Sequence, residues 1–103
     1  MTQLKFKRNV TVIFNTWVEH MIGAGLNIWN FFNEKTFVVT SGIEGRHSPT
    51  SSHYEGRAID VRLPSKKNRQ QIAKKYQKTL GRKYFVLLEN DHIHVQVKRG
   101  VRP

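Results

Sequence analysis

The feature that most constrains the fold is a pair of strand-like segments near the C-terminus. Residues 84–88 (Y-F-V-L-L) form an apolar run, and residues 92–97 (H-I-H-V-Q-V) alternate between polar and apolar side chains. The residues between them, Glu89-Asn90-Asp91, have the side chains of a tight turn. This pattern predicts a β-hairpin, and hence an antiparallel sheet.

A long helix is predicted in the first third of the chain. Residues 10–32 place apolar side chains at helical spacing. Gly23 and Gly25 weaken the helix and predict a kink or a break into two helices. The β-branched run at 10–13 leaves a strand open as an alternative for the start of this segment.

Two further strands are predicted in the middle of the chain. Residues 36–40 (T-F-V-V-T) have the composition of a buried strand, and the polar residues 42–52 form a loop. The second strand covers residues 58–63 and ends before Pro64. Its alternation places three side chains on one face, and we expect this face to line a site: Ala58, Asp60 and Arg62.

A second helix is predicted over residues 66–80, with Ser65 as its N-cap and Gly81 as its stop. The basic tail, residues 98–103, is expected to be flexible. The predicted order is helix, strand, strand, helix, strand, strand. We therefore expect an α+β fold, a small and mostly antiparallel sheet with two to three helices, as a single domain over residues 1–103.

Composition restricts the partners and the chemistry. The chain has 103 residues, no cysteine and a formal charge of +11, so disulfides and thiolate zinc sites are excluded and an anionic partner is favoured. A solvated lysine-rich face is an equally good explanation of the charge. No signal peptide or membrane span is evident, and we expect a monomer made in the cytoplasm.

Three separated residues have the chemistry of a catalytic zinc site, which uses three protein ligands and leaves one position open. They are His53, Asp60 and His94. Gly56 lies between the first two and allows the chain to turn so that both face one point. The alternative is that the histidines are ordinary surface residues, because a His-x-His pattern is common by chance.

Further side chains near these residues are candidates for catalysis. Asp91 precedes the last proposed ligand by three residues and could act as a general base, with Glu89 as its competitor. His92 is expected on the same strand face, where it could orient a ligand or stabilise an oxyanion. Arg46 offers a fixed cation for a carboxylate or an oxyanion, and His47 is a weaker candidate for the same task.

The combined pattern resembles a known family. Residues 52–60 (S-H-Y-E-G-R-A-I-D) followed by 91–94 (D-H-I-H) are similar to the LAS-type zinc peptidases. This group contains D-alanyl-D-alanine carboxypeptidases, phage L-alanyl-D-glutamate endolysins and the Hedgehog signalling domain. Residues 88–95 look most like the small phage- or bacteria-encoded members. The resemblance covers about residues 38–97.

The resemblance implies a Hedgehog/DD-peptidase-like fold with Zn²⁺ held by His53, Asp60 and His94. It also implies that Asp91 is the general base, and Arg46 stands where a loop arginine or histidine assists in some members. The chain lacks the insertions that shape substrate pockets in larger peptidases. The acidic calcium-binding cluster of Hedgehog domains is not evident.

Three functions follow in order of preference. The first is a zinc peptidase that cuts an amide bond in peptidoglycan stem peptides, of the DD-carboxypeptidase or endolysin type, and reaches the bacterial cell wall after release or delivery. The second is a Hedgehog-like zinc-containing binding module without catalysis. The third is a basic nucleic-acid-binding structural protein, which ranks last because no nucleic-acid-binding motif is present. The sequence does not identify which peptide bond is cut.

Overall fold

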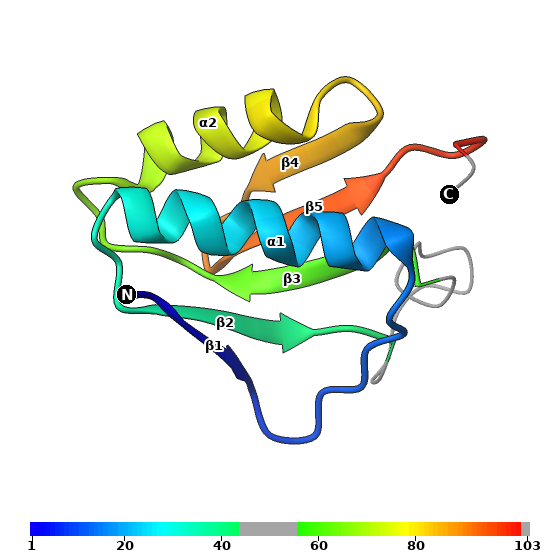
Figure 1. Ribbon diagram of the computed structural model, residues 1–103, viewed down its shortest axis with the longest axis horizontal. Coiled ribbons are helices and arrows are strands. Elements are labelled where there is room, and N and C mark those ends of the chain that lie inside the picture. The colour runs from blue at the N-terminus through cyan, green and yellow to red at the C-terminus, as the bar shows by residue number, and fades with distance from the viewer. Residues whose placement is uncertain (44–55, 102–103) are drawn as a thin grey trace.

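The computed structural model describes residues 1–43 and 56–101. Within them the chain forms two helices and a five-stranded sheet in the order β1-β2-β3-β5-β4, and both helices lie on the same face of the sheet (Figure 1). This arrangement confirms the predicted α+β class with a mostly antiparallel sheet. The elements are β1 (Gln3–Phe6), α1 (Thr16–Phe31), β2 (Thr36–Ser41), β3 (Ala58–Arg62), α2 (Arg69–Leu80), β4 (Tyr84–Leu88) and β5 (His92–Val97).

The sheet register brings the middle and the end of the chain together. The short edge strand β1 runs parallel to β2, and every other strand pair is antiparallel. In the centre, β3 pairs with β5, so that Asp60 faces His94 and Arg62 faces His92. The predicted hairpin of β4 and β5 forms with the predicted bounds. The two segments singled out by sequence are therefore joined through β3.

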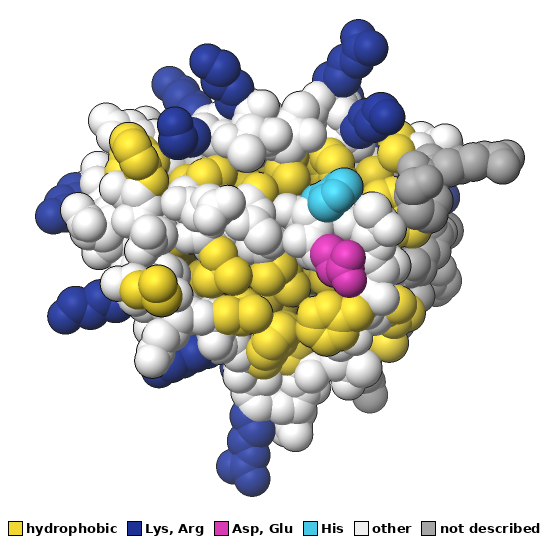
Figure 2. Space-filling model, viewed as in Figure 1, with side chains coloured by type: hydrophobic (Ala, Val, Ile, Leu, Met, Phe, Trp, Pro, Cys, Tyr) yellow, Lys and Arg dark blue, Asp and Glu magenta, His cyan; other side chains and the backbone are white. Residues whose placement is uncertain are grey.

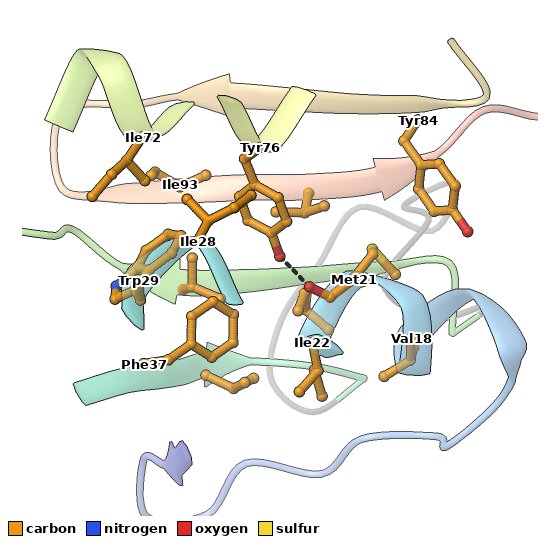
Figure 3. Close-up of a cluster of buried hydrophobic side chains, with 14 of the residues drawn as sticks. Val18, Met21, Ile22, Ile28, Trp29, Phe37, Ile72, Tyr76, Tyr84 and Ile93 are labelled. Carbon is orange, nitrogen blue, oxygen red and sulfur yellow. Dashed lines mark hydrogen bonds between the residues drawn. The ribbon is translucent and has the colours of Figure 1, made fainter. Parts of the chain in front are cut away.

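The hydrophobic core fills the space between the helices and one face of the sheet (Figure 3). Trp29 of α1 is fully buried. The centroid of its ring lies 4.8 Å from that of Phe37 and 5.6 Å from that of Tyr76, and both pairs are edge to face. The buried hydroxyl of Tyr76 donates a hydrogen bond to the backbone oxygen of Met21, which ties α2 to α1. Both helices thus share one core with the sheet.

The first helix starts later than predicted and does not break. Residues 10–14 are not helical, and α1 begins after Asn15, whose side-chain oxygen accepts a hydrogen bond from the Val18 amide. The helix continues through Gly23 and Gly25, so the predicted break into two helices is wrong. A Cβ on Gly25 would lie 2.3 Å from the Phe37 ring, so this glycine permits α1 to approach β2 closely.

The second helix is also shorter than predicted. It begins at Arg69, and Ser65 is not its N-cap, because the Ser65 hydroxyl instead donates to the carboxylate of Glu34. Asn68 occupies the N-cap position without a side-chain capping bond, and its side-chain amide nitrogen donates to Glu34. The predicted stop at Gly81 is confirmed, with φ 86°. Glu34 therefore anchors the segment that was expected to be the first turn of the helix.

The chain ends are attached to the sheet in ways that local pattern did not predict. The basic segment at the N-terminus contains β1, all of whose residues are exposed. In the C-terminal tail, Nη2 of Arg57 donates hydrogen bonds to the backbone oxygens of Lys98 and Val101. Residues 102–103 of this tail lie outside the described residues.

The two faces of the sheet differ in character. The face under the helices carries only apolar core residues from β3 and β5, which are Ile59, Val61, Ile93, Val95 and Val97. On the outer surface of the helix layer, Lys and Arg side chains project around the rim (Figure 2). Among the described residues, neither helix is long and apolar enough to cross a membrane. The polar side chains of β3 and β5 lie on the opposite face of the sheet.

Candidate functional site

The candidate site is centred on two side chains that face each other across β3 and β5. Asp60 and His94 are direct partners in the antiparallel register, and Oδ1 of Asp60 lies 2.9 Å from Nδ1 of His94. Their side chains are 17% and 18% exposed, so both are partly shielded and still reachable from solvent. Alternation explains the placement, because the neighbours Ile59, Val61 and Ile93 face the core.

His94 is held between two oxygen acceptors. Its Nδ1 contacts Asp60, and its Nε2 lies 2.8 Å from Oε1 of Gln96, two residues further along the same face. Burial opposes a positive charge here, but the hydrogen bonds to Asp60 and Gln96 and the nearby charges of Asp60 and Glu89 raise the pKa of His94 above its usual range. The electrostatic environment therefore favours a cation at this position.

His92 extends the site along the same strand face, as the alternation predicted. Its Nε2 lies 3.6 Å from Oδ1 of Asp60, and its Nδ1 lies 2.6 Å from Oδ1 of Asp91. Both imidazoles thus approach the same oxygen of the Asp60 carboxylate, and His92 connects it to a second carboxylate. This is a chain of alternating acids and bases on one face of the sheet.

The proposed general base lies at the edge of this chain. The Asp91 side chain is 87% exposed and contacts His92 rather than the Asp60–His94 pair. Glu89, its competitor, is exposed at the other end of the turn, where its backbone amide donates to the His92 oxygen at 2.9 Å. Its charge contributes to the raised pKa of His94.

Three candidates lie outside the described residues: Arg46, His47 and His53. The structure therefore brings together Asp60, His92, His94 and Asp91, and it does not describe the third expected zinc ligand. Gly56, just before β3, has φ 68°, so it does make the turn for which a glycine was expected. Its carbonyl accepts a hydrogen bond from the side chain of Asn15 at 2.9 Å, which attaches this turn to the start of α1.

The donor set of the described residues can be tested against zinc. Ligand atoms at about 2.0–2.2 Å from a tetrahedral ion are about 3.3 Å apart, so the Asp60 and His94 atoms would need to separate by a few tenths of an ångström. A carboxylate and an imidazole are suitable ligands for Zn²⁺. In residues 1–43 and 56–101, no group of three His, Cys, Asp or Glu side chains is arranged to hold a metal ion. The described pair fits two of the three positions.

Sequence reasoning overlooked the side chains that flank the pair. Leu87 is the direct partner of His94 across β4 and β5, and Phe85 is the partner of Gln96. These two side chains are 48% and 42% exposed. Arg62, the partner of His92, was placed on this face without a role. Alternation within residues 84–88 could have identified the apolar flank, because it puts positions 85 and 87 on one face.

No protein-family model matches the chain, and no curated protein matches its sequence. The functional argument therefore depends on the residues themselves.

Proposed function

We propose that this protein is a zinc-dependent peptidase that hydrolyses an amide bond in peptidoglycan stem peptides. The observation that carries the proposal is the Asp60–His94 pair at 2.9 Å on a polar sheet face, with His92 beside it. The sequence resemblance to the LAS-type peptidases supports the same assignment. The reaction class is amide hydrolysis, of the DD-carboxypeptidase or endolysin type.

The proposed metal ligands are Asp60 and His94, together with His53. Bound zinc would polarise the scissile carbonyl and lower the pKa of water. The carboxylate of Asp60 on β3 and the hydrogen-bond acceptors that raise the pKa of His94 both favour a bound cation at this position. A zinc ion would take the place of the proton shared by the Asp60–His94 hydrogen bond, so metal binding should compete with protons.

The remaining residues of the site handle protons and orientation. Asp91, exposed at the hairpin turn, is the proposed base that accepts a proton from water and returns it to the leaving amine. His92 holds Asp91 through its Nδ1 and faces Asp60 through its Nε2, so it sets the position of the base relative to the ligands. Arg46 is the candidate cation for a substrate carboxylate or an oxyanion.

The charge of the protein suits the proposed substrate. The chain carries 18 basic and 7 acidic residues, and Lys and Arg side chains ring the surface seen in Figure 2. Bacterial cell walls carry carboxylate and phosphate groups, so the positive surface would favour encounter with them. The proposed place of action is accordingly the bacterial cell wall.

Digestion of purified sacculi tests the proposal. The protein loaded with zinc should release muropeptides whose masses identify the amide bond that is cut, and a chelator should abolish the release. Zinc-loaded protein that leaves sacculi, D-Ala-D-Ala peptides and L-Ala-D-Glu peptides intact would contradict catalysis. That result would favour the zinc-containing binding module.

A further inference from the structure

A hollow of about 650 Å³ lies at the end of β3, the strand that carries Asp60, and belongs to no function assigned above. It forms where the turn between α1 and β2 meets the connection between β3 and α2. Its lining includes three exposed cationic side chains, Lys35, Arg62 and Lys67. In the part of the chain that the structure describes, no carboxylate forms a salt bridge with Arg62 or Lys35.

The one carboxylate in this lining is already engaged. Oε1 of Glu34 accepts the backbone N–H of Ser65 at 2.8 Å, and its Oε2 accepts the Ser65 hydroxyl and the side-chain amide of Asn68. Glu34 therefore holds the wall of the hollow together and does not extend toward Arg62 in an ion pair. Three cations and one occupied carboxylate leave the hollow with a net positive charge, which suits an anionic group.

Arg62 connects the hollow to the candidate site. It lies two residues after Asp60 on the same face of β3, which corresponds to about 7 Å along a strand. It is also the direct cross-strand partner of His92. A substrate that reaches from the Asp60–His94 pair toward the C-terminal end of β3 would therefore bring its next group to the Arg62 guanidinium.

We propose that this hollow is a substrate subsite that binds a peptide carboxylate, with Arg62 as its principal contact and Lys35 and Lys67 as supporting charges. A guanidinium can bind a carboxylate through two parallel hydrogen bonds, which gives orientation as well as affinity. The choice of a stem-peptide carboxylate rests on the proposed function. The subsite would select stem peptides whose carboxylates are free over those in which they are amidated.

The test is a titration of the full chain, dialysed free of metal so that binding is measured without turnover. The probes are the stem tetrapeptide L-Ala-γ-D-Glu-L-Lys-D-Ala and the same peptide with every carboxylate converted to an amide. We expect about tenfold tighter binding of the free acid, with NMR shifts at the amides of Glu34 and Ser65. Arg62→Gln should remove this preference, and Arg62→Lys should retain only part of it.

Arg82→Gln is the matched control, because it removes the same charge from an exposed position in the turn between α2 and β4. It should keep the preference for the free acid. Equal binding of the two peptides by the wild type, or equal effects of Arg62→Gln and Arg82→Gln, would overturn the subsite. Carboxylate-selective binding without any sacculus cleavage would contradict the proposed peptidase and support the subsite. Sacculus cleavage that does not depend on Arg62 would support the peptidase and contradict the subsite.

Discussion

His94 Nδ1 lies 2.9 Å from Asp60 Oδ1, although the two residues are 34 positions apart in the chain. The contact exists because β3 and β5 pair in a register that sets these residues directly opposite each other. It joins the two sequence motifs and supplies two of the three proposed metal ligands.

Removing one member of this pair should remove zinc. We expect His94→Ala to weaken zinc binding more than about 100-fold, beyond the loss that follows from mutating a residue that only supports a ligand. Calorimetric titration with zinc measures the change. Zinc at about 100 times its dissociation constant should also stabilise the wild type by about 2.7 kcal/mol, and the variant should lose this gain.

His20→Ala is the control for that experiment. His20 lies on α1, with its Nδ1 3.3 Å from the Tyr84 hydroxyl, on the helix side of the sheet. It should bind zinc as the wild type does. If both alanine variants keep wild-type affinity, the assignment of His94 as a ligand is wrong.

Mutating the proposed base should slow hydrolysis without weakening zinc binding. Asp91→Asn removes a basic oxygen from an exposed side chain that contacts His92. We expect the variant to hold zinc and to lose at least about 100-fold in kcat on muropeptides. The comparison is Glu89→Gln, which should retain more activity. Undiminished cleavage by Asp91→Asn, with a large loss in Glu89→Gln, would reassign the base to Glu89.

Replacing glycine by alanine at two positions of α1 should change the stability of the fold in opposite directions. A Cβ on Gly25 would lie 2.3 Å and 2.5 Å from two ring atoms of Phe37, so Gly25→Ala should destabilise the fold by about 1–3 kcal/mol. Gly23 has no neighbour within 4 Å of such a Cβ, so Gly23→Ala should stabilise the fold by about 0.5–1 kcal/mol. Urea unfolding of both variants gives the two values. Equal effects would show that helix propensity alone decides.

Glu34 should make the fold sensitive to acid. Burial opposes its charge, but hydrogen bonds from Ser65 and Asn68 and the nearby ammonium of Lys67 hold the pKa of Glu34 below its usual range. Because the folded-state pKa is the lower one, the stabilisation is complete above the unfolded pKa and is lost as the pH falls through the folded pKa.

Thermal unfolding between about pH 7 and about pH 2 measures this dependence. The wild type should lose stability toward acid, and Glu34→Gln should show a smaller loss because it has no charge to neutralise. The control is Glu19→Gln, which removes an exposed carboxylate from the first turn of α1. A Glu34→Gln profile that parallels the wild type would rule out this carboxylate as the source.

Local pattern was sufficient where the neighbours in sequence decide the structure. The alternation in residues 92–97 and the turn residues before it were enough to predict β4 and β5 with their observed bounds. Alternation within residues 58–63 likewise placed Asp60 and Arg62 together on one face of β3. The helix starts were predicted wrongly for two different reasons. The cap of α1 is a local signal that was overlooked, because Asn15 bonds Val18 three residues further on, whereas the hydroxyl of Ser65 donates to Glu34, 31 positions away in the chain.

The sequence by itself determined the fold class, the hairpin and the side chains proposed to hold a metal ion or move a proton. These properties depend on side-chain chemistry and on the two-residue period of a strand. Only the tertiary structure decided that Asp60 lies between His92 and His94, and that Arg62 joins their face to a cationic hollow. Strand register and the packing of connections are set by contacts between residues far apart in the chain, which local pattern does not encode.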